Sequence, residues 1–123
     1  MAEGKLALMS GELLPPAQLK QMLTTVPIRP ENPVGGPGYG LGIMKVPTPC
    51  GLVWSQDGGL PGYFSINFTD STGEQTAGVL VSEYFVSFGP DPELTEASQN
   101  LQDAVTCAMT NGPIPSAPGK PVS

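Results

Sequence analysis

An alternation of apolar and polar residues in the middle of the chain constrains the fold most. Residues 64–69 read F-S-I-N-F-T, which is the period of a β-strand with one buried face. Residues 70–74 include Gly73 and predict a turn, and residues 76–84 return as a second β-rich run. The middle of the chain is therefore predicted to be an antiparallel meander.

The segments before this pair predict a loop and a further hairpin. Residues 26–38 hold four prolines and three glycines, which indicates a loop or linker. Residues 38–43, G-Y-G-L-G-I, are typical of a strand with something packed on its glycine face, and they lack the G-x-G-x-x-G spacing of a dinucleotide fingerprint. Residues 47–51, P-T-P-C-G, predict a turn that joins strands over residues 39–46 and 52–57.

Helices are predicted on both sides of the strands. Residues 13–23, L-L-P-P-A-Q-L-K-Q-M-L, predict a short helix with proline in its first turn. A second, amphipathic helix is predicted to begin at Asp91 and Pro92 and to stop at N-G-P over residues 111–113. Its apolar stripe consists of Leu94, Ala97, Leu101, Ala104, Val105 and Ala108.

These elements predict an α+β domain over residues 1–111. We expect an antiparallel β-meander of three to four strands, with the C-terminal helix packed on the sheet and a short N-terminal helix. Residues 112–123 contain several prolines and little apolar mass, which predicts a disordered tail.

The composition disfavours several classes of partner and location. Five Lys plus Arg against eleven Asp plus Glu give a net charge of −6 over 123 residues, which repels phosphate backbones and anionic lipids. We therefore expect no nucleic acid and no membrane partner. No apolar run approaches the ~20 residues of a membrane span, and residues 1–10 have too short an apolar core for a signal peptide. As written, the chain is expected to be cytoplasmic.

Histidine is absent from the chain, which removes the commonest general base and the commonest metal ligand. Cys50 and Cys107 are the only possible thiolates, and two widely separated cysteines do not make a zinc site. We expect neither a metal nor a cofactor. The two cysteines are either small buried hydrophobic residues or a disulfide, which suits an exported protein better than a cytosolic one.

Four short stretches in chain order resemble a known family. They are L-L-P-P-A-Q-L, G-Y-G-L-G, T-P-C-G-L-V-W and D-G-G-L-P-G-Y. Over residues 11–110 the chain resembles the C-terminal part of the serine β-lactamase and D-alanyl-D-alanine carboxypeptidase family, in its class C and carboxypeptidase-like branch. The resemblance implies a partial β-lactamase or transpeptidase-like domain, whose full-length relatives are expected to be exported.

Members of that family use three motifs in chain order. Ser-x-x-Lys supplies the nucleophile and its base, Tyr-x-Asn usually follows, and the third is Lys or His, a small or polar residue and Gly on a strand lining the cleft. Gln56-Asp57-Gly58 falls at the third position, where relatives commonly have His-Asp-Gly. The resemblance implies that these three residues bind substrate and that the backbone N–H of Gly59 is an oxyanion-hole donor. The alternative to this binding role is a structural one, in which Gly58-Gly59 forms a tight bend where two elements approach each other.

The catalytic residues of the family are missing from the chain. No serine is followed by lysine three residues later. Ser65-Ile66-Asn67 and Tyr63-Phe64-Ser65 mimic the second motif, but both follow the third motif and strand alternation explains them. Gln56 can donate a hydrogen bond to a substrate carboxylate, but an amide carries no charge and cannot shuttle a proton. No residue of the chain is therefore assigned a catalytic role.

Three interpretations follow. The chain is a truncated serine hydrolase that is inactive alone, the C-terminal half of a split hydrolase completed by another chain, or a non-catalytic module that binds a peptide or acyl group. The parent substrate stays open between a β-lactam, a D-Ala-D-Ala peptide and an ester.

The resemblance also implies a cross-link and an incomplete sheet. Relatives place cysteines similarly, which favours a disulfide between Cys50 and Cys107. In family members, strands that precede the first motif complete the central sheet. Without them, the strand containing residues 79–81 is expected at an open edge, where the missing N-terminal part or a second copy would pair.

Overall fold

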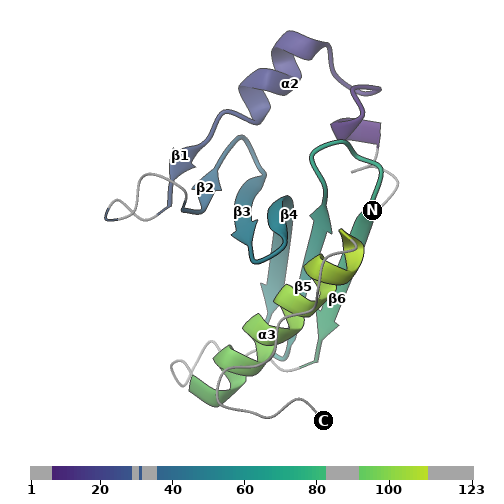
Figure 1. Ribbon diagram of the computed structural model, residues 1–123. Coiled ribbons are helices and arrows are strands. Elements are labelled where there is room, and N and C mark those ends of the chain that lie inside the picture. The colour runs from purple at the N-terminus through teal and green to yellow at the C-terminus, as the bar shows by residue number, and fades with distance from the viewer. Residues whose placement is uncertain (1–6, 29–30, 32–35, 83–91, 111–123) are drawn as a thin grey trace.

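The described strands form one antiparallel sheet in which the strand order follows the chain order (Figure 1). The computed structural model describes residues 7–28, 31, 36–82 and 92–110. The strands are β1 (Val26–Pro27), β2 (Gly38–Tyr39), β3 (Met44–Thr48), β4 (Gly51–Leu60), β5 (Tyr63–Thr69) and β6 (Thr76–Val81). The helices are α2 (Pro16–Met22) and α3 (Pro92–Met109), after a short helical segment at residues 7–9. The α+β class is confirmed, although the sheet has six strands rather than three or four.

The predicted meander is confirmed by the pairing of β4, β5 and β6. The pairs run without interruption from Trp54↔Thr69 to Leu60↔Tyr63 and from Phe64↔Val81 to Thr69↔Thr76. Side chains alternate between the two faces of a sheet, so residues paired across the strands share a face. Within the described chain β6 is the last strand of the sheet.

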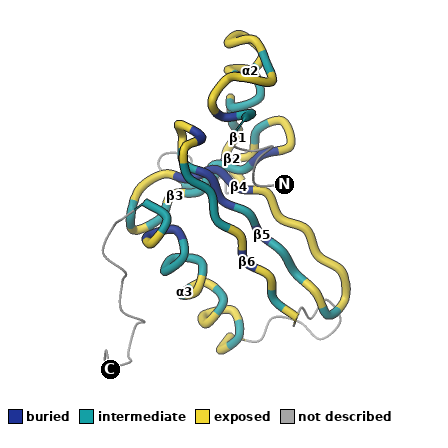
Figure 2. The backbone as a smooth tube through the Cα atoms, turned by 90° about the vertical axis from the view of Figure 1, so that its right-hand side faces the viewer, coloured by how far each residue is buried: buried dark blue, intermediate teal, exposed yellow. Residues whose placement is uncertain are grey.

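One face of the meander is covered by α3. The core on this face consists of Val53, Ile66, Phe68 and Val79, and Val105 and Met109 of α3 pack against it. Figure 2 shows α3 along one side of the sheet, with buried residues concentrated toward one end of the strands.

A second, smaller cluster lies on the opposite face. Trp54 packs there with Met9 and Ile43, and Met22 and Leu23 at the end of α2 pack against them. The apolar stripe of the N-terminal helix thus contacts the sheet through its last turn. This cluster covers the Trp54 end of β4 only, and residues 56–60 are exposed.

The G-Y-G-L-G stretch has a glycine that the fold requires. A Cβ atom at Gly40 would collide with the carbonyl oxygen of Met22, and the N–H of Leu41 donates a hydrogen bond to that same oxygen (3.0 Å). The group packed on the glycine face is therefore the C-terminal end of α2. This close approach interrupts the predicted strand, because residues 40–43 lie between β2 and β3.

One sequence expectation about loops is wrong, and one alternative that the sequence left open is excluded. The segment predicted as a loop over residues 26–38 contains β1 and the first residue of β2, which pair through Val26↔Tyr39 and Pro27↔Gly38. The alternative of a tight bend at Gly58-Gly59 is excluded, because both glycines lie within β4. The chain turns afterwards at Pro61-Gly62, where Gly62 has φ +86°, a conformation that favours glycine.

The apolar stripe predicted for the C-terminal helix is only partly correct. Ala97, Leu101 and Ala108 are exposed, whereas Thr106 and Cys107 are buried. Thr106 can be buried because its hydroxyl donates to the helix carbonyls of Gln102 (3.0 Å) and Asp103 (3.1 Å). The predicted capping residue Asp91 and the predicted tail lie outside the described residues, and no described helix is long and apolar enough to cross a membrane.

Candidate substrate-binding wall

The three residues predicted to bind substrate and the predicted oxyanion-hole residue, Gly59, lie consecutively in the second half of β4. We call residues 56–59 the candidate wall. Gln56, Asp57, Gly58 and Gly59 are exposed, and they pair with β5 through Asn67, Ile66, Ser65 and Phe64 respectively. The strand holds their backbone in a fixed register. Figure 2 shows this part of β4 as an exposed stretch beyond the buried segment around Trp54.

This half of β4 has a strand neighbour on one side only within the described chain. β3 pairs with residues 51–55 of β4, ending at Met44↔Ser55, whereas β5 pairs with residues 54–60. Backbone N–H and C=O groups of a strand point alternately to its two sides. Some backbone donors and acceptors of residues 56–60 therefore face a side without a described strand, which is where an extended ligand can hydrogen-bond.

The predicted site residues are divided between the two faces of the sheet. Alternation places Gln56 and Gly58 on the face of Trp54, opposite α3, and Asp57 and Gly59 on the face of α3. We call the face opposite α3 the free face. Of the four side chains, Gln56 alone can reach a ligand above the free face, because Gly58 contributes backbone only.

Gly58 is a glycine without a structural requirement in the described chain. Its φ lies outside the left-handed region, and a Cβ atom there would contact only the hydroxyl oxygen of Ser65, at 4.0 Å. Neither backbone conformation nor packing among residues 7–28, 31, 36–82 and 92–110 therefore demands glycine at this position. A glycine in a strand often marks a place where a ligand or another backbone approaches closely.

The two sequences that mimic the second family motif lie on β5. Ser65 and Asn67 point to the free face beside Gly58 and Gln56, and the Ser65 hydroxyl donates to the carbonyl oxygen of Gly58 (3.5 Å). Sequence reasoning assigned these residues to strand alternation alone. The alternation was correct, but the cross-strand register, which no sequence motif signals, also places Asn67 next to Gln56.

A hollow lies at the end of the β4–β5 hairpin. It has a volume of about 580 Å³ and is lined by residues including Gly58, Leu60, Tyr63, Ser65 and Leu80. Volumes of about 300–1,000 Å³ are usual for small-molecule sites. The hollow adjoins the predicted oxyanion-hole segment, because Gly58 and Gly59 both line it.

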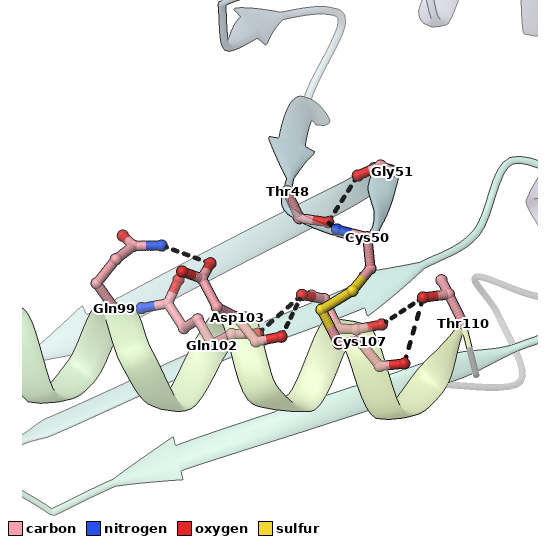
Figure 3. The surroundings of a disulfide bond; sticks show 9 residues. Thr48, Cys50, Gly51, Gln99, Gln102, Asp103, Cys107 and Thr110 are labelled. Carbon is pink, nitrogen blue, oxygen red and sulfur yellow. Dashed lines mark hydrogen bonds between the residues drawn. A yellow bond between two sulfur atoms is a disulfide. The ribbon is translucent and has the colours of Figure 1, made fainter. Parts of the chain in front are cut away.

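The start of β4 is fixed by a disulfide between Cys50 and Cys107, whose Cα atoms are 5.2 Å apart. This confirms the pairing that the family resemblance favoured. Figure 3 shows how the bond joins the β3–β4 turn to α3. Thr48 orders the turn, since its hydroxyl accepts a hydrogen bond from the Cys50 N–H (3.2 Å) and donates to the Gly51 carbonyl (2.6 Å).

Ser55 is an unusual residue immediately before the candidate wall. It is fully buried (0% exposed), and its hydroxyl has no hydrogen-bond partner in the described structure. Register and alternation place it on the α3 face, opposite Phe68 of β5. It therefore does not point toward the free face on which Gln56 lies.

The wall has the chemistry of a binding surface. Backbone N–H groups and side-chain amides donate hydrogen bonds to carbonyl and carboxylate oxygens. Acyl transfer also needs an activated nucleophile, and the sequence contains no Ser-x-x-Lys. The predicted site residues therefore offer hydrogen-bond donors to a ligand, and the sequence holds no Ser-x-x-Lys that would attack one.

The antiparallel sheet with its C-terminal helix resembles a fragment of the β-lactamase-like fold. One solved structure makes the likeness specific. It is the crystal structure of a D-stereospecific amidohydrolase from Streptomyces sp., a member of the penicillin-binding protein and β-lactamase fold superfamily.

The match to the amidohydrolase has a TM-score of 0.57 and a sequence identity of 41%. It covers 63% of this chain and 23% of the amidohydrolase chain, so the matched part of this chain spans about a quarter of the amidohydrolase. No protein-family model matches the sequence.

Proposed function

We propose that this chain is the third-motif part of a β-lactamase-like serine hydrolase, supplying a substrate-binding wall and no catalysis of its own. The observation that carries the proposal is the position of Gln56-Asp57-Gly58-Gly59 on an exposed strand half, in a fold whose solved neighbour is an amidohydrolase. The neighbour's 41% identity supports a hydrolase origin for the segment.

In this proposal Gln56 holds the substrate and the N–H of Gly59 stabilises the developing oxyanion. Preorganised backbone donors of this kind contribute strongly to acyl transfer, but only after a nucleophile attacks. Removal of one member of a nucleophile–base unit already loses nearly all the rate. The isolated chain is therefore expected to be inactive, and activity requires a second part that carries Ser-x-x-Lys and Tyr-x-Asn.

That second part can belong to another chain, which is the split-hydrolase form of the proposal. β6 lies at the end of the described sheet, and an edge strand presents unpaired backbone groups to a further strand. We propose this edge as the place where the complementing part, or a second copy of this chain, pairs. The disulfide suits an oxidising compartment, which supports export and weighs against the cytoplasmic location expected from the sequence.

The proposal is tested by hydrolysis and labelling of the purified chain. It should neither hydrolyse a chromogenic β-lactam, a p-nitrophenyl ester or a D-amino acid p-nitroanilide, nor bind a penicillin probe covalently. Stoichiometric labelling of any serine would overturn it.

An exchange variant tests the hydrolase origin. In it, residues of this chain replace the matched segment of the Streptomyces amidohydrolase. We expect a folded enzyme with reduced but measurable amide hydrolysis, because the third motif retains its backbone and loses its basic side chain. A folded exchange variant without activity, even after Gln56→His, would argue against the proposal.

A non-catalytic peptide- or acyl-binding module is the second candidate. The one-sided pairing of residues 56–60 and the adjoining hollow favour it, because an extended peptide can add to such a strand. Specific binding of an acyl peptide by the chain, together with a folded but inactive exchange variant, would favour this candidate over the hydrolase part.

A further inference from the structure

A small polar hollow lies between β1, β2 and β3, and no residue of the candidate wall lines it. Figure 1 shows α2 leading into β1, beside β2 and β3. The hollow has a volume of about 80 Å³ and is lined by Thr25, Pro27, Gly36, Pro37, Gly38 and Lys45. Of these residues Lys45 alone is charged, and only Lys45 and Thr25 have polar side chains. We call this space the Lys45 hollow.

The side chain of Thr25 lies directly over Gly38. A Cβ atom at Gly38 would come within 2.7 Å of the Thr25 hydroxyl oxygen and 2.8 Å of the Thr25 Cβ atom, so only glycine leaves room for this side chain. The segment that carries Thr25 is held on both sides. Before it, the Met22 carbonyl accepts a hydrogen bond from the Leu41 N–H (3.0 Å), and after it β1 pairs with β2. Packing therefore fixes Thr25 at the Lys45 hollow.

Lys45 lies beside Gly38 in the same row of the sheet. It pairs with Gly38 of β2 on one side and with Trp54 of β4 on the other, so all three residues belong to the free face. Because Gly38 has no side chain, this row places none between Lys45 and Thr25. Trp54 is buried and Lys45 is half-buried, and a lysine buries its methylene stem along apolar surface while its ammonium stays at the polar end.

The two polar groups of the Lys45 hollow have no partner of their own. Within the described residues, neither the Lys45 ammonium nor the Thr25 hydroxyl makes a hydrogen bond or an ion pair. The chain has eleven Asp plus Glu against five Lys plus Arg, so carboxylates are abundant, yet no described one pairs with this half-buried lysine. Lysines that are withdrawn from water are usually paired. The donors of Lys45 and Thr25 are therefore available to a ligand.

We propose that the Lys45 hollow binds a single carboxylate group. The Lys45 ammonium and the Thr25 hydroxyl each donate a hydrogen bond to one of its oxygens, and hydrogen bonds to an ionised group are the strong ones. The two prolines of the lining have no backbone N–H, so these two side chains carry the recognition. The site is separate from the candidate wall and is independent of the hydrolase proposal.

Size and charge favour a carboxylate over a larger anion. A volume of about 80 Å³ equals roughly two to three water molecules of about 30 Å³ each, so the hollow holds one small group rather than a whole ligand. One ammonium balances one negative charge, whereas a phosphate dianion would add charge to a chain whose net charge is already −6. The carboxylate can belong to a free small acid or to the C-terminus of a peptide that extends out of the hollow.

The site is tested by NMR titration of the full chain, isotope-labelled in its lysine and threonine side chains, at neutral pH and at an ionic strength held constant with sodium chloride. The probes are acetate, acetamide as its uncharged analogue of equal size, phosphate and N-acetyl-glycine. We expect acetate to give saturable shifts of the Lys45 ε-methylene and Thr25 methyl signals, and acetamide to give none. Tighter binding of N-acetyl-glycine than of acetate would assign the site to a peptide C-terminus, and the reverse order to a free small acid.

Three variants locate the binding. Lys45→Met keeps the stem beside Trp54 and removes the charge, so acetate should bind about tenfold more weakly or worse. Thr25→Val keeps the packing over Gly38 and removes the hydroxyl, which should weaken binding about fivefold. Lys20→Met removes the other described lysine, which is exposed on α2, and should leave the affinity unchanged. If a variant fails to fold, the comparison of acetate with acetamide on the unmodified chain still decides the matter.

Several results would overturn the proposal. Equal shifts with acetate and acetamide, shifts that rise linearly with acetate concentration, or undiminished binding in Lys45→Met would leave Lys45 as a side chain that only shields Trp54. Tighter binding of phosphate than of acetate would overturn the assignment to a carboxylate. None of these results bears on the hydrolase proposal, because the exchange variant is judged by hydrolysis alone.

Discussion

Gln56 lies directly opposite Asn67 in the pairing of β4 with β5, so two neutral amide side chains occupy adjacent positions on the free face of the sheet. A basic residue is expected at the first of these positions from the family resemblance. The pair provides uncharged hydrogen-bond donors and no group that titrates near neutral pH.

Restoring a basic residue at position 56 should raise the activity of the exchange variant. Gln56→His supplies a group that can transfer a proton near neutral pH, and general acid–base catalysis contributes about 10²–10⁴-fold. We expect an increase in kcat of about tenfold or more, measured as hydrolysis of a D-amino acid p-nitroanilide. Gln56→Asn is the matched control, and an equal increase for both variants would contradict the prediction.

Substitution of Gly58 by alanine should separate binding from stability. The added Cβ atom meets nothing closer than the Ser65 hydroxyl at 4.0 Å, so the midpoint of thermal unfolding should not fall. Binding of an acyl peptide, the ligand of the second candidate function, should weaken, because the methyl group stands where the ligand approaches the strand. A variant that binds normally would show that glycine at this position has no role in recognition.

Loss of the disulfide should destabilise the chain strongly. A cross-link that closes a loop between residues separated by 57 positions contributes about 4 kcal/mol to the free energy of unfolding by the chain-entropy relation. Urea unfolding with and without a reductant measures the effect. The double variant Cys50→Ala/Cys107→Ala should be as unstable as the reduced chain and insensitive to reductant, and a reduced chain as stable as the oxidised one would refute this expectation.

Ser55→Ala should stabilise the protein by about 1 kcal/mol, because a buried hydroxyl without a partner retains its desolvation cost. Thr106→Ser, which keeps the bonded hydroxyl, and Thr106→Ala, which removes it, form the comparison set at a similarly buried position. Unfolding in urea gives the free energies. A loss of stability in Ser55→Ala would indicate that the hydroxyl has a partner, such as a buried water.

The β6 edge should make the isolated chain self-associate or aggregate. Leu80 is 86% exposed on this last strand, and a lysine on an edge strand disfavours pairing with another chain. Leu80→Lys should therefore shift sedimentation velocity profiles toward the monomer, while Leu52→Lys should not. If the unmodified chain is a monodisperse monomer with a cooperative, high-temperature melt, the edge is not an association site.

The fold was predictable where local pattern and burial agree. The alternation in residues 64–69 predicts β5 because polar and apolar residues face different layers, and the turn at Gly73 follows from local chemistry. The helix stripe was less predictable, since Leu101 looks apolar in sequence but is 45% exposed. The cross-link at Cys107 and the packing of Val105 and Met109 fix which face of α3 turns to the sheet, and these are tertiary contacts.

The position of the candidate wall in the sequence was predictable, but the arrangement of its side chains was not. The motif places Gln56-Asp57-Gly58 on a strand, but a glycine pair in sequence does not distinguish a bend from an extended strand. Pro61-Gly62, two residues later, takes the turn instead, with Gly62 at positive φ. The amide pair with Asn67 depends on the register that this turn sets, which is why no motif reveals it.

The sequential strand order has a consequence for how the chain is assembled during synthesis. Each strand pairs with the strand made just before it, so a ribosome-bound chain can extend the sheet as residues emerge, with mostly local contacts. The disulfide of Cys50, by contrast, can form only after Cys107 has been synthesised in α3, the last described element. Formation of the disulfide therefore indicates that α3 has packed against the completed sheet. Alkylating the free thiols at intervals during translation would show when this packing occurs.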